Sequence, residues 1–272
     1  GKMLRLYLES QEGEALSLPD IMDLANLEKM NELRARIEAL VEDPDTLEAL
    51  KPWYRMFCKR PCFHDQYLQT FNRDNVTLVD TEGQGVERIT ESGVVVAGVE
   101  YPVDCIVYAT GFEVGTGFQR VSGFEIYGRD GLSLSDKWSD GIRTLHGMHI
   151  HGFPNCFLMS TIQGGFTVNY PHMLDEVATH VAHIVGHALA IEKEVVETSA
   201  EAEASWVQTI LDKGVRGGII GDETCTPGYY NNEGKPREHF EQMVSYGDGP
   251  IPFFNLLAQW RDTGDFAGLT ID

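Results

Sequence analysis

The segment FCKRPCFHDQYLQTFNRDNVTLVD, residues 57–80, is the part of the sequence around which the rest can be organised. Two adjacent cations, Lys59 and Arg60, precede a polar turn and then the apolar run Val76–Val79, which has the composition of a strand. A guanidinium stays charged at any working pH and offers a planar fork of donors, so Arg60 is suited to stabilise an oxyanion. Lys59 is a compact point charge suited to a phosphate. The alternative is that both are solvated loop cations.

The composition of the 272 residues limits the class of protein, and its apolar content is ample for one large domain or two smaller ones. The net charge of -21 argues against a nucleic-acid or anionic-membrane partner, because phosphate binding needs positive charge spread over a face. No apolar run approaches the roughly 18 residues of a membrane span, and no signal peptide is visible, so we expect a cytoplasmic protein. Five scattered cysteines are typical of a reduced cytosolic protein: Cys58, Cys62, Cys105, Cys156 and Cys225.

Helices are predicted in the first fifty residues. Ser17–Asp20 has a capping hydroxyl, an early proline and an acid, which together indicate a helix start. Apolar residues then recur every three to four positions from Leu24 to Leu40. Asp43 and Pro44 begin a second, shorter helix. We expect these helices to be packing elements without chemistry.

Strands are predicted after Asp80. The β-branched pattern indicates a hairpin with strands at Val86–Thr90 and Val94–Val99. The run Val103–Phe112 reads as a buried strand that ends in Ala109, Thr110 and Gly111. Small residues at a strand end let the backbone approach a flat or phosphorylated ligand, and the alternative is a simple turn.

A strand, a loop and a helix are predicted between residues 152 and 185. Asn155–Ser160 reads as the strand and Gln163–Gly165 as a flexible loop. Asn169 or Tyr170 then caps a long helix that has Pro171 in its first turn. The free amides and the positive dipole end of this helix would face whatever lies past the strand.

Two regions near the C-terminus complete the prediction. Residues 201–207 continue a second helix, in which Trp206 is most simply a core anchor. Residues 225–236 form a turn-rich loop with the adjacent tyrosines Tyr229 and Tyr230, and long loops of this kind often serve as lids.

Three sets of residues contain side chains of the types that bind metals, but none has a recognised signature with spaced carboxylates, so no metal is expected. These sets are His180, His183 and His187; His146, His149 and His151; and Cys58, Cys62 and His64.

The run from Lys59 through Pro61, with Tyr67 and residues 70–76, resembles a signature segment of Baeyer-Villiger monooxygenases, which are class B flavoprotein monooxygenases. In that family the lysine of the pair contacts the 2′-phosphate of NADPH. The arginine stabilises the flavin peroxide and the intermediate that it forms with a ketone. The resemblance therefore implies these roles for Lys59 and Arg60.

Asp104 to Phe112 resembles the crossover of flavoproteins with two dinucleotide-binding domains, where the chain leaves the NADP domain and returns to the FAD domain. This implies that Ala109, Thr110 and Gly111 bind cofactor. The same motif occurs in flavin-containing and N-hydroxylating monooxygenases, so it indicates the superfamily. The Lys59 segment narrows the resemblance to one family.

The resemblance also implies residues around the flavin ring. In that family the strand, loop and helix of residues 155–185 close over the isoalloxazine ring, and the helix N-terminus favours the negative charge of the reduced flavin. The residues implied near the FAD are Phe166, Asn169, Tyr170 and Met173. For Met173 the alternative is an ordinary core methionine. The loop with Tyr229 and Tyr230 would pack against the nicotinamide cofactor and the substrate.

The fold implied is α/β, part of a Rossmann-like flavoprotein with two dinucleotide-binding domains and a helical insert. The expected domains are a helical insert at 1–54, the C-terminal part of an NADP-binding domain at 55–108 and that of an FAD-binding domain at 109–272. The sequence has no G-x-G-x-x-G fingerprint after a strand. It begins at Gly1 without an initiator methionine, so we expect the C-terminal portion of a longer enzyme.

The resemblance implies an enzyme that uses NADPH, FAD and O2 to insert one oxygen atom next to a ketone carbonyl, giving an ester or lactone. Three alternatives remain open. The chain is a non-catalytic module, or one half of a split flavoprotein that needs its missing N-terminal half. It is a flavin-containing or N-hydroxylating monooxygenase that acts on amines or sulfur compounds. It is, as the most distant reading, a metal-dependent hydrolase.

Overall fold

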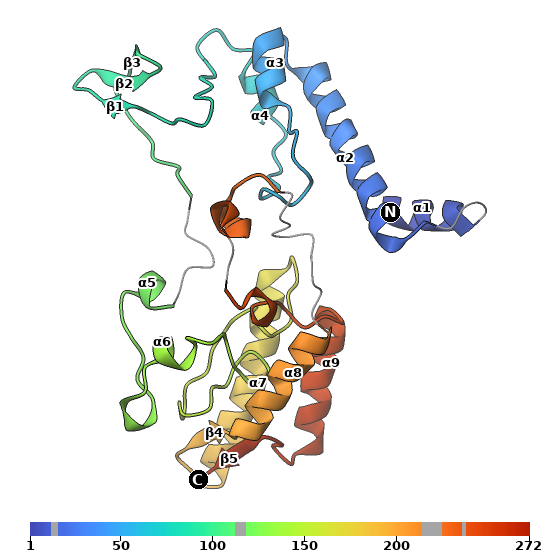
Figure 1. Cartoon of the computed structure of the whole chain (residues 1–272), viewed down its shortest axis with the longest axis vertical. Helices are drawn as coiled ribbons and strands as arrows, with labels where there is room; N and C mark the ends of the chain where they lie inside the picture. Colours follow the sequence, from blue (N-terminus) through green and yellow to red (C-terminus); the bar gives the residue numbers. More distant parts are fainter. Residues whose placement is uncertain (12–15, 112–117, 214–224, 236–237) are drawn as a thin grey trace. The chain divides into compact units, whose positions relative to one another are not determined.

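The protein is described from a computed structural model that defines residues 1–11, 16–111, 118–213, 225–235 and 238–272. The chain divides into two compact units, each described here by itself (Figure 1). Unit 1 comprises Gly1–Phe112 and Ile219–Gly234, and unit 2 comprises Glu113–Gly218 and Lys235–Asp272. The assignment of the chain to cofactor domains stays a prediction.

Unit 1 begins with four helices: α1 (Lys2–Gln11), α2 (Leu18–Leu40), α3 (Pro44–Leu50) and α4 (Tyr67–Thr70). The predicted start of α2 is confirmed, because the Asp20 amide donates to the Ser17 hydroxyl and the Ser17 amide donates to the Asp20 carboxylate. The predicted start of α3 is also confirmed, with Asp43 accepting from the Thr46 amide at 2.8 Å. The long helix α2 contacts each of the other three helices.

A three-stranded antiparallel sheet follows in unit 1. Its strands are β1 (Arg88–Ile89), β2 (Gly93–Val96) and β3 (Val99–Pro102), in that order. The predicted hairpin is confirmed by the pairing of Arg88 with Val95, but its strands are shorter than expected. Ala97 and Gly98 both have a positive φ, 49° and 75°, and form a tight turn that divides the run Val94–Val99. The third strand, β3, was not predicted.

Three other strand predictions are wrong for the described residues: Val76–Val79, residues 103–111 and Asn155–Ser160 belong to no strand. Phe157 makes one isolated bridge with His149, while Val107 and Tyr108 are 83% and 71% exposed. An apolar run becomes a buried parallel strand only when neighbouring strands and covering helices are present. The described residues supply no such neighbours, so propensity alone predicted strands that do not form here.

Unit 2 is mainly helical, and its predicted long helices are confirmed (Figure 1). Its helices are α5 (Phe118–Ser122), η1 (Arg129–Gly131), α6 (Leu134–Lys137), α7 (Tyr170–Ala190), α8 (Ala200–Lys213), η3 (Phe240–Gln242) and α9 (Pro250–Thr263). The strand β4 (Val196–Thr198) pairs antiparallel with β5 (Leu269–Ile271). The largest core cluster is apolar: Leu145, Met148, Met173, Val177, Trp206, Ile210, Tyr246, Phe253, Phe254 and Leu257. Among the described residues, no helix combines the length and the apolar character needed to cross a membrane.

The segment around Gln163 is buried in unit 2 and held by hydrogen bonds. The prediction of a flexible loop at Gln163–Gly165 is therefore wrong. Gln163 is fully buried. Its amide oxygen accepts from the Thr144 amide at 3.1 Å and from the Thr144 hydroxyl at 2.7 Å. Its amide nitrogen donates to the carbonyls of Ile142 and Gln242 at 2.6 and 2.9 Å. The two glycines indicated flexibility, but the buried amide at Gln163 fixes the loop through tertiary hydrogen bonds.

A buried carboxylate ties further parts of unit 2 together. Glu203 on α8 is 4% exposed and accepts from the Lys137 ammonium and from the His151 amide, both at 2.9 Å. The burial of this charge is therefore compensated by an opposite charge and by a backbone donor.

Candidate functional site

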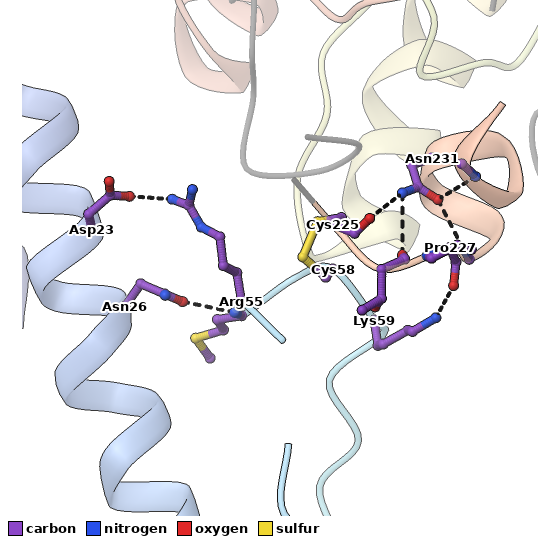
Figure 2. The surroundings of a disulfide bond; sticks show 12 residues. Asp23, Asn26, Arg55, Cys58, Lys59, Cys225, Pro227 and Asn231 are labelled. Carbon is purple, nitrogen blue, oxygen red and sulfur yellow. Dashed lines mark hydrogen bonds and ion pairs between the residues drawn. A yellow bond between two sulfur atoms is a disulfide. The ribbon is translucent and has the colours of Figure 1, made fainter. Parts of the chain in front are cut away.

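The segment that carries the two cations is anchored on helix α2 (Figure 2). Arg55 forms an ion pair with Asp23, and the Met56 amide donates to the Asn26 side chain at 2.8 Å. The Cys58 amide donates to the Arg55 carbonyl at 3.1 Å. The backbone that enters Lys59 and Arg60 is therefore held to α2 by side-chain contacts.

A disulfide joins Cys58 to Cys225, 167 residues later in the sequence (Figure 2). The expectation that all five cysteines are reduced is therefore wrong. Cys58 and Cys225 are 3% and 9% exposed, whereas Cys62 and Cys105 are exposed thiols. The number of cysteines gave no signal for this bond, because the fold decides which two sulfur atoms meet.

The loop that begins at Cys225 is organised by Asn231, which lies in the helix η2 (Tyr229–Gly234). The Asn231 side-chain nitrogen donates to the Cys225 carbonyl at 3.1 Å (Figure 2). Its oxygen accepts from the amides of Gly228 and Gly234 at 2.9 and 3.2 Å. Asn231 was not among the predicted site residues, although asparagine in a turn-rich loop is a signal for this type of capping.

The cations contact this loop. The Lys59 ammonium donates to the Pro227 carbonyl (Figure 2), and Arg60 Nη1 donates to the Tyr230 hydroxyl at 3.4 Å. A Cβ atom at Gly228 would lie 2.9 Å from the Lys59 ammonium, so glycine permits the close approach. Three predicted site residues, Lys59, Arg60 and Tyr230, therefore lie together in unit 1, and the side chain of Tyr229 lies outside the described residues.

The other predicted cofactor residues of unit 1 form an open segment. Ala109, Thr110 and Gly111 are exposed and belong to no strand. Gly111 has a φ of 86°, and nothing lies within 4 Å of the position that a Cβ atom would occupy. Another residue would be strained in this conformation, and the backbone is open to a ligand at this point.

The predicted flavin residues of unit 2 lie at the start of α7, and the structure divides them into two kinds. Asn169 caps the helix, accepting from the His172 amide at 3.4 Å. Phe166 and Tyr170 are 40% and 47% exposed. Met173 is fully buried in the main core cluster, where it packs as an ordinary core methionine.

Three buried histidines lie together in unit 2 without a metal-ligand arrangement. The ring centroid of His180 is 5.8 Å from that of His146 and 6.2 Å from that of His149. Both ring nitrogens of His180 are buried without a hydrogen-bond partner. Among the described residues, no group of three or more His, Cys, Asp or Glu side chains is arranged to hold a metal ion.

Burial lowers the pKa of these histidines, to about 3 for His146, about 4 for His149 and about 2 for His180. The neighbouring His146, His149, Arg261 and His183 lower the pKa of His180 further. The rings are therefore neutral in the folded protein at neutral pH.

We expect unit 2 to lose stability as the pH falls below about 6.5, because unfolding lets these rings take up protons that the folded state excludes. Each histidine lowers the free energy of unfolding by up to about 1.4 kcal/mol per pH unit between its unfolded pKa and its lower folded pKa. Urea unfolding at pH 7.5 and 5.5 measures the difference. His180→Leu should reduce this pH dependence, and Gln208→Ala, at an exposed position on α8, should leave it unchanged. Equal pH dependence in both variants would contradict the assignment of this pH dependence to the buried histidines.

No known protein-family profile matches the sequence. The sequence is 51% identical to neopentalenolactone D synthase of Streptomyces avermitilis over 252 residues, which is 92% of this chain and 42% of that protein. It is 47% identical to a Baeyer-Villiger monooxygenase of Streptomyces coelicolor over 242 residues, or 88% of this chain and 40% of that protein.

Solved structures share the fold. The polycyclic ketone monooxygenase of Thermothelomyces thermophila superposes with a TM-score of 0.83 at 36% identity, over 93% of this chain and 42% of that chain. A steroid monooxygenase bound to NADP superposes with a TM-score of 0.73 at 28% identity, over 91% of this chain and 46% of that chain.

The fold is therefore that of part of a flavoprotein monooxygenase. The resemblance of the sequence to Baeyer-Villiger monooxygenases is confirmed, and it extends over nearly the whole chain. The chain spans about two fifths of the length of the curated relatives that it matches.

Proposed function

We propose that this chain is the C-terminal portion of an enzyme that uses NADPH, FAD and O2 to insert one oxygen atom next to a ketone carbonyl, giving an ester or lactone. FAD, when bound and reduced by NADPH, supplies the activated oxygen. The Arg60 guanidinium stabilises the negative charge that develops on oxygen, and Lys59 holds the 2′-phosphate of NADPH. We place the enzyme in the cytoplasm.

The observation that carries this proposal is the fixed cation pair. Arg60 follows a backbone anchored on α2, and its guanidinium donates to the hydroxyl of Tyr230 on a loop that is covalently attached to Cys58. A preorganised cation stabilises charge in a transition state without reorganising at the moment of reaction. The similarity to a Baeyer-Villiger monooxygenase of Streptomyces coelicolor supports this chemistry.

The residues present fit parts of the two cofactors. The open backbone at Gly111 suits close approach of a ligand in unit 1. In unit 2 the exposed rings of Phe166 and Tyr170 suit contact with a flat ring, at a helix N-terminus that favours negative charge. The Gly-rich fingerprint for a dinucleotide pyrophosphate is not in this sequence, so we propose that the rest of the enzyme provides it.

A segment exchange tests the proposal. We would replace the matched segment of the Streptomyces coelicolor Baeyer-Villiger monooxygenase with this chain, and assay a ketone that the host oxidises. The expected result is a chimera that shows flavin absorbance and forms ester or lactone with NADPH. A folded, flavin-loaded chimera that forms no ester or lactone would overturn the proposal.

A second candidate, a non-catalytic half that binds another chain, is favoured by the exposed apolar segment at Val107 and Tyr108. The same chimera decides between the candidates. A chimera that takes up flavin and oxidises the ketone excludes the non-catalytic reading for this segment. Oxidation of an amine or thioether with no reaction of ketones would instead indicate the flavin-containing or N-hydroxylating class.

A further inference from the structure

We propose that the Cys58–Cys225 disulfide is a redox-controlled clamp that holds residues 225–235 against Lys59 and Arg60, and that a dithiol reductant opens it. The regulatory meaning of the clamp rests on the function proposed above, because that function gives the two cations their roles. The disulfide itself and its effect on the loop do not depend on that function.

The first step is that one side of the clamp is fixed. Cys58 follows a segment held to α2 by the Arg55–Asp23 ion pair and by the bond from the Met56 amide to Asn26 (Figure 2). A loop that is attached to Cys58 is therefore attached to a backbone segment that α2 holds in place.

The second step is that the other side of the clamp keeps its own shape. Asn231 bonds to the carbonyls of Cys225 and Thr226, at 3.1 and 3.3 Å, and to the amides of Gly228 and Gly234. These bonds lie within residues 225–235, so they persist when the disulfide is broken. The loop would then separate from the cations as one body.

The third step concerns the contacts between the loop and the two cations, which include two hydrogen bonds. Lys59 donates to the Pro227 carbonyl, and Arg60 donates to the Tyr230 hydroxyl at the long distance of 3.4 Å. A covalent attachment raises the effective concentration of the loop at these partners. Without it, such partly exposed hydrogen bonds are weak.

The redox step is a thiol–disulfide exchange. A thiolate of the reductant attacks Sγ of Cys225, the more exposed of the two cysteines, and the S–S bond breaks to leave the Cys58 thiolate, which takes a proton. The second thiol of the reductant then displaces Cys225 as a thiol. The disulfide gains two electrons, and the dithiol is oxidised to its own disulfide. In a reducing cytoplasm, disulfides are usually transient or redox-sensing, which fits a clamp that opens.

The experiment uses the purified chain with dithiothreitol and needs no flavin, NADPH or ketone. Alkylation and mass spectrometry should find the three free cysteines Cys62, Cys105 and Cys156 before reduction, and all five after it. Acetylation of lysines should then be timed by peptide mass. We expect Lys59 to react about tenfold faster after reduction, because it loses the tethered carbonyl. Lys51, paired with Glu38 and Glu48 elsewhere in unit 1, is the internal control and should not change.

Two variants sharpen the test. Cys225→Ser should show fast acetylation of Lys59 with and without reductant, whereas Cys105→Ser should keep the response of the unsubstituted chain. The comparison of oxidised and reduced chain needs no substitution, so it holds even where a variant folds poorly. Five free thiols before reduction, or an unchanged rate at Lys59, would overturn the clamp and leave the proposed enzymatic function standing.

In the chimera, reduction should raise the KM for NADPH, and Cys225→Ser should show the raised value without reductant. A clamp that opens with no change in KM would limit the inference to the loop and overturn its link to the cofactor. Failure of the chimera to oxidise ketones would contradict the proposed function, while the acetylation result would remain.

Discussion

Replacing Arg60 with Ala in the flavin-loaded chimera should lower ester formation by about 10³-fold, close to complete loss, while the FAD stays bound. The guanidinium is the positive charge that we assign to the developing negative charge on oxygen. Its removal should not affect the pyrophosphate contacts that retain the flavin. The measurement is the rate of ester formation beside the flavin absorbance of the same sample.

Three further variants separate the effect of the positive charge of Arg60 from the effect of its position. Arg60→Lys keeps the charge and loses the planar fork, so it should recover part of the rate. Tyr230→Phe removes the hydroxyl that accepts from Arg60, so the rate of ester formation should fall less in this variant than in Arg60→Ala. Arg73→Ala, an exposed arginine in the same stretch of sequence, is the matched control and should retain the rate. Ester formation near the original rate in Arg60→Ala would exclude Arg60 from the chemistry.

Replacing Gln163 with Ala should lower the free energy of unfolding of the chain by on the order of 4 kcal/mol. The substitution leaves buried groups of Thr144, Ile142 and Gln242 without their partner. Urea unfolding followed by tryptophan fluorescence measures the loss, since the Trp206 indole donates to the Gln163 carbonyl at 2.9 Å.

Gln208→Ala is the matched control for this substitution. Gln208 lies on the exposed side of α8 and donates to Asp212 at 2.8 Å. An exposed bond of this type contributes little, so we expect a change within about 0.5 kcal/mol. A similar effect of the two substitutions would mean that the hydrogen bonds of Gln163 do not stabilise unit 2.

The helices could be predicted because their signals are local. Ser17 with Asp20, Asp43 with Pro44, and Asn169 with Pro171 each mark a helix start within four residues of sequence, and the structure has a helix at all three. The strands at Val76–Val79 and Asn155–Ser160 could not be judged in this way. A strand depends on neighbours that lie elsewhere in the fold, and an apolar run carries no information about whether they are present.

The same distinction between local signals and distant contacts applies to the candidate site. Lys59 and Arg60 could be selected because two cations in a recognisable motif are adjacent in sequence, and Tyr230 because it stands in a turn-rich loop. The bond between Cys58 and Cys225 could not be predicted, since the contact of two cysteines 167 positions apart in sequence depends on how the chain between them folds. Gln163 was misjudged for a related reason, because its partners at Ile142 and Gln242 are distant in sequence.

The same disulfide closes a covalent ring through residues 58–225, and that ring contains the whole segment Glu113–Gly218 of unit 2. A single cut in the backbone anywhere inside the ring opens it without dividing the molecule. The nicked protein would keep its mass, apart from one added water, until a reductant separates the two pieces. Electrophoresis without reductant would therefore count a cleaved chain as intact, and the purity of a preparation has to be judged after reduction.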